Sequence, residues 1–151
     1  MIRRANPDDI ADLTRLIADF RDWFGKSEPD AVTIRATLGR LIDDPATEYL
    51  LAVDDDGAAV GFCQLRYRLS VWTGVDDCWL EDLFVSEAVR GGGHGRALVE
   101  AAFAGARGRG CKRIELDVNV DNVAAQGFYE SLGFTTEPKP PGRTLFISRG
   151  L

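Results

Sequence analysis

A run of glycines flanked by arginines is the segment of the sequence that most directly suggests chemistry. It lies between an expected strand and an expected helix, where the first backbone N–H groups of the helix have no partner and attract anions. Glycine lets a phosphate approach the backbone and tolerates positive φ, and arginine adds charge. The run predicts a phosphate-binding turn, with a merely flexible turn as the alternative. It reads Arg90, Gly91, Gly92, Gly93, His94, Gly95 and Arg96.

Two common phosphate-binding motifs do not fit this turn. A P-loop requires Gly-x-x-x-x-Gly-Lys-Ser/Thr, which the segment lacks. A dinucleotide-binding Gly-x-Gly-x-x-Gly that starts at Gly91 or Gly93 would need its third glycine where Arg96 or Leu98 stands. The segment instead matches Arg/Gln-x-x-Gly-x-Gly/Ala, through Arg90, Gly93 and Gly95.

Four motifs in one order make the chain similar to a known superfamily. They are the run Leu80–Val85, the turn at Arg90, the residues 119–122 and the run Phe128–Phe134. Together they resemble the GCN5-related N-acetyltransferases (GNAT), whose pyrophosphate signature the turn matches. The resemblance covers nearly the whole chain, because the elements expected outside this block also fit. The spacing of Glu81 from Arg90 is similar to that of the spermidine/spermine acetyltransferases in particular.

The resemblance implies a binding mode for the cofactor, acetyl-coenzyme A. Two neighbouring strands splay apart, and backbone groups of the first pair with the pantetheine arm. One of those N–H groups polarises the thioester carbonyl as an oxyanion hole. Asn122 and Tyr129, seven residues apart, would share the helical face that meets this arm and the thiol. The implied cofactor-binding residues are Leu83, Phe84, Val85, Arg90, Gly91, Gly92, Gly93, His94, Gly95, Arg96, Asn119, Asn122 and Tyr129.

An amine acceptor needs a base before it can attack the thioester. An amine with a pKa near 10 is neutral in only about one molecule in a thousand at pH 7, which costs about 4 kcal/mol. Glu81 is the candidate base, acting directly or through water. Asp82 is the reserve, because alternation along a strand sends neighbouring side chains to opposite faces and the sequence does not say which face meets the acceptor. Both carboxylates could instead be structural groups paired with their neighbours.

Tyr129 is the acid that the resemblance implies for the departing coenzyme A thiolate, with an ordinary aromatic on a helix face as the alternative. A thiol titrates near 8.5, so this leaving group needs less help than the amine does. Two residues depart from the family pattern. His94, the only histidine, stands where an aliphatic residue is usual, and we expect a positional or phosphate-adjacent role for it. Gly127 interrupts an expected helix at a cost of about 1 kcal/mol relative to alanine.

Acceptor contacts in this superfamily come from the segment between the first two helices and from the strand before the cofactor site. Aromatic side chains beside acids suit a cationic amine, although packing and solvation would explain them equally well. A small-molecule amine is therefore the expected acceptor, with a protein N-terminus or lysine as the alternative. The candidate acceptor-binding residues are Trp23, Phe24, Glu28, Trp72, Asp76, Asp77, Trp79 and Glu81.

The elements that must position these residues can be read from periodicity and caps. They fit a single α+β (α/β) domain over residues 1–151. The resemblance implies that this is the GNAT fold, with about four helices around a mixed sheet of about six or seven strands, which opens between the family's fourth and fifth strands, here 77–85 and 113–120. The expected helices begin at Asn6 and near 27–30, and cover 95–107 and 122–132. The expected strands are 49–53, 58–69, 77–85, 113–120, 134–136 and 143–148. Asp54–Gly57 is the hairpin turn, and the strand after it either contains a bulge near 61–64 or is covered on both faces.

Composition excludes several other classes of protein. The 151 residues carry 18 basic and 24 acidic side chains, and this net charge of −6 disfavours a nucleic-acid partner. The three cysteines are widely spaced without histidine partners, which predicts neither disulfides nor a metal site. No apolar run reaches the length of a membrane span, and the N-terminus does not read as a secretory signal, so a cytoplasmic protein is expected.

Two other functions and one assembly stay open at this point. A non-catalytic acyl-coenzyme A binding module would keep the phosphate turn without turnover, although intact Glu81 and Tyr129 speak against it. The fold could also serve only as a scaffold for interaction. Many relatives pair as homodimers through their late strands, but no residue after Phe134 specifies such a surface.

Overall fold

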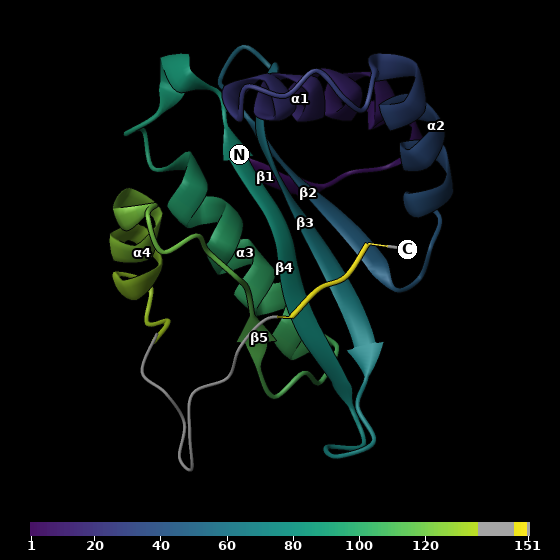
Figure 1. The fold of residues 1–151 in the computed structure, drawn as a ribbon, viewed down its shortest axis with the longest axis vertical. Helices are drawn as coiled ribbons and strands as arrows, with labels where there is room; N and C mark the ends of the chain where they lie inside the picture. Colours follow the sequence, from purple (N-terminus) through teal and green to yellow (C-terminus); the bar gives the residue numbers. More distant parts are fainter. Residues whose placement is uncertain (136–146, 151) are drawn as a thin grey trace. The chain divides into compact units, whose positions relative to one another are not determined.

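The computed structural model describes residues 1–135 and 147–150 and divides the chain into two units, Met1–Asp117 and Val118–Leu151. The single-domain organisation expected from the sequence stays a prediction. The first unit is built on a five-stranded sheet with the strand order β1-β2-β3-β4-β5 (Figure 1). The strands are β1 (Ile2–Arg4), β2 (Thr47–Val53), β3 (Ala59–Leu69), β4 (Asp76–Val85) and β5 (Ile114–Glu115).

Three helices of the first unit cover the two faces of this sheet. Side chains of α1 and α2 share a core with Leu51, Phe62 and Phe84, which lie directly opposite one another on β2, β3 and β4. We call this side the α1 face. The third helix, α3, lies on the other side, where a Cβ added to Gly105 would be 3.6 Å from the Tyr67 hydroxyl. The helices are α1 (Ile10–Trp23), α2 (Ala31–Leu41) and α3 (His94–Gly108), with 3-10 turns η1 (Pro7–Asp9) and η2 (Glu87–Val89).

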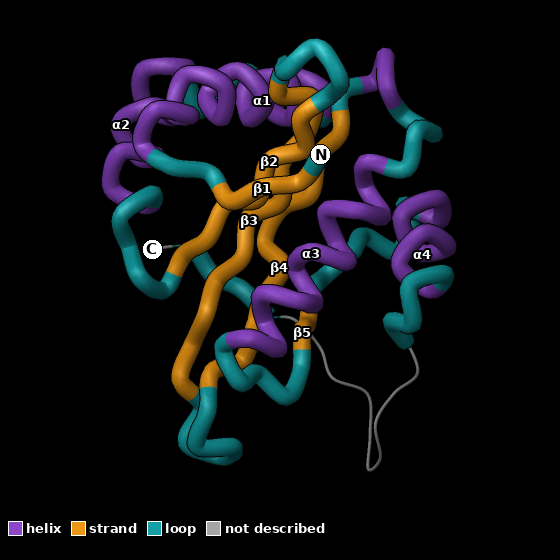
Figure 2. The backbone as a smooth tube through the Cα atoms, turned by 180° about the vertical axis from the view of Figure 1, so that it is seen from behind, coloured by secondary structure: helices purple, strands orange, loops and turns teal. Residues whose placement is uncertain are grey.

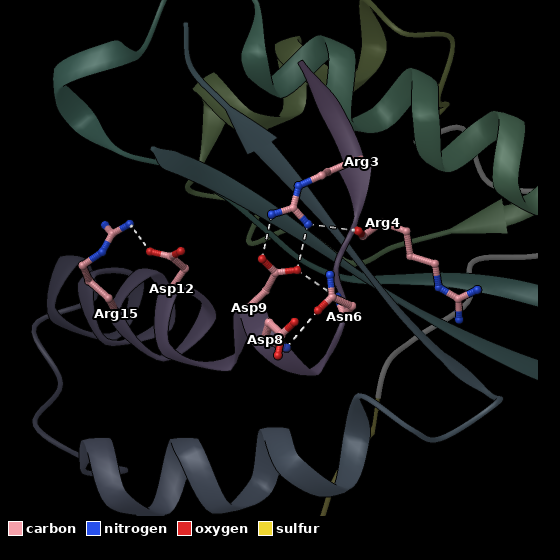
Figure 3. Close-up of polar contacts among 7 residues, drawn as sticks. All are labelled: Arg3, Arg4, Asn6, Asp8, Asp9, Asp12 and Arg15. Atoms are coloured by element: carbon pink, nitrogen blue, oxygen red, sulfur yellow. Dashed lines mark hydrogen bonds and ion pairs between the residues drawn. The ribbon is translucent and has the colours of Figure 1, made fainter. Parts of the chain in front are cut away.

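The 3-10 turn η1, which leads directly into α1, is fixed by hydrogen bonds that also attach it to β1 (Figure 3). Asn6 accepts a hydrogen bond from the Asp8 amide at 2.8 Å, and the Asp9 carboxylate accepts one from the Asn6 amide at 2.9 Å. Arg3 of β1 donates two more to Asp9, at 2.7 and 2.6 Å. The hydrogen bond from Arg3 is the main reason that the pKa of Asp9 lies below its ordinary value. The helix start predicted from Asn6 is therefore confirmed, and the strand before it was not predicted.

The hairpin of β2 and β3 follows the sequence prediction closely. The Gly57 amide donates to the Asp54 carbonyl at 3.2 Å, and Gly57 has φ +85°, as an Asp-Gly turn requires. Of the two explanations for the change of phase in β3, burial on both faces holds, whereas the bulge of β3 lies at Val60, before the segment 61–64 where it was expected. The pairing with β2 skips Val60, and residues 61–65 are buried on both faces of the sheet.

β5 is much shorter than the strand expected over 113–120. It pairs with β4 in parallel through two positions, Cys78 opposite Ile114 and Trp79 opposite Glu115. Figures 1 and 2 both draw it as a short segment beside one part of β4. From Leu80 onward β4 has no strand partner on this edge within the first unit. The sheet thus opens between its fourth and fifth strands, as the GNAT resemblance implies.

The second unit contains α4 (Val123–Glu130). Asn122 caps it by accepting a hydrogen bond from the Ala125 amide at 3.1 Å, and Gly133 ends its last turn with φ +88°. The strand predicted over 143–148 lies mostly outside the described residues, as does the end of that over 134–136. Across residues 1–135 and 147–150, no helix combines the length and apolar character needed to cross a bilayer.

The attachment of α1 to β1 predicts a difference between two acidic residues. Asp9 is buried, so Asp9→Ala leaves Arg3 and the Asn6 amide without their acceptor, and we expect the free energy of unfolding to fall by about 2 kcal/mol. Asp12→Ala is the matched control, because its ion pair with Arg15 is exposed and worth under about 0.5 kcal/mol. Urea unfolding of both variants measures the difference, and equal losses would contradict a specific role for Asp9.

Candidate active site

The Gly-rich turn has the backbone geometry of an anion site. Gly91 and Gly93 have φ of +84° and +85°, values that other residues rarely adopt. α3 begins at His94, and the Ala97 amide makes the first helical hydrogen bond back to the Gly93 carbonyl, at 3.0 Å. The amides of His94 and Gly95 precede that bond, so they face the turn at the positive end of the helix. A phosphate group would fit there.

His94 is half-buried and its imidazole lies back against the turn. A Cβ added to Gly92 would be 3.5 and 3.6 Å from two of its ring atoms. These are ordinary contacts, whereas the Val89 carbonyl oxygen, at 3.2 Å, would be the tight neighbour of such a Cβ. The positional role of His94 stays a prediction.

The open edge of β4 presents backbone groups from alternate residues. The Ser86 amide donates to Val60 of β3 at 2.9 Å, so the backbone of Phe84, two residues earlier, also faces β3. A Cβ added to Gly61 of β3 would lie 2.7 Å from the Phe84 carbonyl oxygen, which agrees with this direction. Leu83 and Val85 therefore face the open edge. The Val85 carbonyl already accepts a hydrogen bond from Arg90 at 3.0 Å, and the pairing of these residues with the pantetheine arm stays a prediction.

A bulge in β4 decides where its acidic side chains lie. Leu80 is opposite Leu65 and Asp82 is opposite Gln64, so the register skips Glu81. Asp82, Gln64 and Tyr49 lie directly opposite one another on three strands, and they therefore share a face. Their row is two residues from the row that contains Phe84, so this is the α1 face. Glu81 itself is exposed. The simple alternation assumed for these two carboxylates fails because of the extra residue.

The carboxyl group of Asp82, on β4, has a raised pKa. Burial, followed by the negative charges of Glu81 and Asp117, raises its pKa from an ordinary 3.8 to about 6. Asp117 was missed by the sequence analysis. It lies two residues beyond β5, and only the parallel pairing of β5 with β4 brings its charge near Asp82. The three residues form a group that we call the acidic cluster: Glu81, Asp82 and Asp117.

The expected acceptor-binding residues do not all lie together. Trp23 and Phe24 end α1, and the Phe20 ring of that helix lies 5.3 Å from the ring of Phe84, two residues from Asp82 on the same face. Trp72 is 93% exposed in the loop between β3 and β4, which lies at the opposite end of β4 from α1 in both views (Figures 1 and 2). Asp76, at the start of β4, is about 20 Å along the strand from Asp82. The expected acceptor-binding residues therefore form two groups. Trp23 and Phe24 make the first, near Phe84, and the second, at the other end of β4, includes Trp72, Asp76 and Asp77.

The acidic residues of the second group already have cationic partners. Arg113 donates two hydrogen bonds to Asp77, at 3.0 and 2.7 Å, and Asp77 is only 4% exposed. Arg109 lies 3.4 Å from Asp76. An acceptor amine would have to displace these guanidinium groups. Trp79 is on the α1 face opposite Arg66, and Glu28 is exposed between α1 and α2.

The remaining predicted residues belong to the second unit. Asn119 accepts a hydrogen bond from the Asp121 amide at 2.8 Å, and its carbonyl accepts one from the Asn122 amide at 2.9 Å. Both asparagines therefore shape the turn into α4. Tyr129 is half-buried on α4, with ring contacts to Phe128 and Phe134 at 5.2 and 5.5 Å.

The raised pKa of Asp82 predicts a change of stability with pH. The folded protein binds more protons than the unfolded chain between about pH 4 and 6, so this group makes the protein less stable as the pH rises through that window. We expect Asp82→Asn to be more stable than the wild type at pH 8 by up to about 3 kcal/mol, and nearly equal to it at pH 4. Urea unfolding at both pH values measures this. Asp55→Asn, at an exposed turn position, should show no such pH-dependent gain.

Comparison with known proteins gives the family. Residues 13–134 match the model of the Acetyltransferase (GNAT) family. An aminoglycoside N(6')-acetyltransferase type 1 of Stenotrophomonas maltophilia is 32% identical over 136 residues, which are 88% of this chain and 84% of that protein. A thialysine N-epsilon-acetyltransferase of Sus scrofa is 27% identical, over 88% of this chain and 82% of that protein.

A solved structure has the same fold. It is that of a protein from Arthrobacter sp. FB24 assigned to the acetyltransferases, and it superposes with a TM-score of 0.88 and 31% identity over 100% of this chain and 96% of its own. The α+β arrangement, with a mixed sheet and parallel β4 and β5, is the GNAT fold. The chain therefore belongs to the GNAT family, whose members carry an acetyl group from acetyl-coenzyme A to an amine.

Proposed function

We propose that the protein acetylates a small cationic amine by direct attack of the amine on the thioester, with a carboxylate of β4 as the base. The position of Asp82 carries this proposal. Its carboxyl group lies on the α1 face of β4, within the stretch where β4 has lost its β5 partner, and its pKa is raised to about 6. A base with that pKa is mostly ionised at pH 7 and is still basic enough to accept a proton.

Asp82 is the better candidate base, and Glu81 supports it. Glu81 is exposed, so its carboxylate lies in water that weakens its influence on a bound amine. Its charge nevertheless contributes to the raised pKa of Asp82. In the proposed reaction the acceptor ammonium gives a proton to Asp82, and its nitrogen then bonds to the thioester carbon. The attacking nitrogen then loses its second proton and the carbon–sulfur bond breaks. The thiolate takes a proton from Tyr129, whose phenolate regains one from that second proton through water.

The cofactor is proposed to bind where backbone groups face outward. The amides of His94 and Gly95 would hold the pyrophosphate, with Arg96 adding charge. The backbone of Leu83 and the N–H of Val85, whose carbonyl accepts from Arg90, would pair with the pantetheine arm, and one of these N–H groups would stabilise the developing oxyanion. This assignment rests on the φ values of the turn and on the alternation that leaves these two residues at the open edge.

The acceptor is proposed to be cationic because of the charges on this side of β4. The acidic cluster attracts an ammonium group, and the exposed aromatic rings at the end of α1 can bind its apolar or cationic parts. The two curated relatives described above are named for an aminoglycoside and for thialysine, which are small amines. A protein N-terminus or lysine is the alternative acceptor. A panel of polyamines, aminoglycosides and peptides, assayed for coenzyme A release, separates them.

The catalytic assignment predicts a ranking of three variants at pH 7. Asp82→Asn removes the base and should lower kcat/KM about 10²- to 10⁴-fold. Glu81→Gln and Tyr129→Phe should each cost less. In the wild type kcat/KM should rise through about pH 6, the pKa of Asp82, and Glu81→Gln should move this rise to lower pH. A larger loss for Glu81→Gln than for Asp82→Asn would make Glu81 the base.

The cofactor assignment predicts a specific loss at one glycine. Gly93→Ala places a side chain at φ +85°, which costs about 1 to 2 kcal/mol and should weaken acetyl-coenzyme A binding about tenfold. Gly108→Ala, at the other end of α3 with open space around it, should leave the affinity unchanged. Calorimetric titration needs no acceptor, so it also identifies a binding module: tight binding without turnover across the amine panel would refute the enzymatic proposal.

A further inference from the structure

Four aromatic rings join the end of α1 to β4, and we call them the aromatic wall: Phe20, Trp23, Phe24 and Phe84. Phe20 lies 4.9 Å from Phe24, 6.4 Å from Trp23 and 5.3 Å from Phe84, measured between ring centroids. Phe84 is buried, whereas Trp23 is 48% exposed. The wall thus runs from the buried face of β4, two residues from Asp82, to a partly exposed indole.

Arg90, in the Gly-rich turn, contacts two rings of the aromatic wall. Its guanidinium carbon lies 5.5 Å from the centroid of Trp23 and 5.7 Å from that of Phe84. Its Nε donates to the Val85 carbonyl at 3.0 Å, and a terminal nitrogen lies 3.6 Å from Glu87. An arginine stacked on two rings and hydrogen-bonded to the main chain has a defined position, which a lone exposed tryptophan does not.

These contacts differ from those that the Arg/Gln-x-x-Gly-x-Gly/Ala signature suggests for Arg90. The signature predicts a side chain that binds pyrophosphate, yet two of its donor positions serve Val85 and Glu87. The other arginine of the turn, Arg96, is half exposed and lies in the first turn of α3, next to the amides that face the phosphate position. Arg96 also has an acidic neighbour, Glu100 at 3.9 Å, but its charge lies beside the phosphate position whether or not Arg90 contributes.

We infer that Arg90 is a positioning residue for the acceptor, because a cation–π contact and a main-chain hydrogen bond let it fix the indole of Trp23 near Phe84, two residues along β4 from Asp82. The inference rests on the proposed function, in which an amine binds beside Asp82. It assigns the two arginines of one motif to the two substrates: Arg96 to acetyl-coenzyme A and Arg90, through Trp23, to the amine.

The kinetic test compares Arg90→Met, Arg90→Lys and Arg96→Met in the full chain. Methionine keeps the length of the side chain without its charge, whereas lysine keeps a cation. We expect Arg90→Met to raise the KM of the amine about two- to fivefold, the factor for a partly exposed cation–π contact, and Arg90→Lys to restore most of it. The Kd of acetyl-coenzyme A, measured by calorimetry, should change less than about twofold in both.

Arg96→Met should show the reverse pattern, a weaker affinity for acetyl-coenzyme A with little change in the KM of the amine. If Arg90→Met instead weakens acetyl-coenzyme A binding while the KM of the amine stays unchanged, Arg90 binds phosphate and the inference is wrong. Trp23→Ala should raise the KM of the amine, and Arg90→Met added to it should raise that KM no further, because the ring it positions is gone.

A second measurement needs no substrate. The chain has three tryptophans, so Trp72→Phe and Trp79→Phe together leave Trp23 as the only one. In this background Arg90→Met should increase the quenching of Trp23 fluorescence by acrylamide, and Arg90→Lys should largely reverse the increase. Unchanged quenching overturns the inference even if the enzyme is active. A wild type without turnover on any amine refutes the proposed function and the acceptor role of Trp23 with it, while the quenching still reports whether Arg90 orders the ring.

Discussion

Backbone hydrogen bonding along β4 is the constraint on which the rest of the first unit depends. One edge of this strand pairs with β3 from Asp76 to Val85, and the other edge pairs with β5 at two positions only. A strand inside a sheet must satisfy its N–H and C=O groups, and a half-paired strand has an edge available to another extended chain. The pantetheine arm, with its two amide groups, is such a chain. In the proposed binding mode, the cofactor would therefore act as a further strand along the open edge of β4.

The local features of this arrangement could be predicted from the sequence because neighbouring residues determine them. The cap at Asn6, the hairpin turn before Gly57 and the glycines before α3 each depend on a few consecutive residues, and the structure confirms all three. β1 could not be predicted, since three residues are too few to show alternation. Its position depends on pairing with β2, nearly 50 residues away in the sequence.

The candidate site was predictable as a region, but the roles of its carboxylates were not. The bulge at Glu81 is a property of the register between β3 and β4, and no residue type in the run Leu80–Val85 indicates it. Without the bulge, Asp82 would be on the other face. Asp117 could not be recognised either, because its influence on Asp82 requires the parallel pairing of β5. Arg90 was identified from the motif, whereas its contacts with Trp23 depend on where α1 ends in space. Long-range pairing, rather than composition, decided these points.

The ion pair of Asp77 with Arg113 has a consequence for how wide the opening in the sheet is. Asp77 is near the start of β4 and Arg113 immediately precedes β5, so the pair lies at the vertex of a fork whose arms are the two strands. Two hydrogen bonds between a planar guanidinium and a buried carboxylate fix direction as well as distance. Val85 is about 25 Å along β4 from this vertex, so a rotation of about 5° there would move the end of the arm by about 2 Å. In the proposed binding mode, a contact near the start of β4 would therefore influence the room beside the thioester, although the two lie far apart.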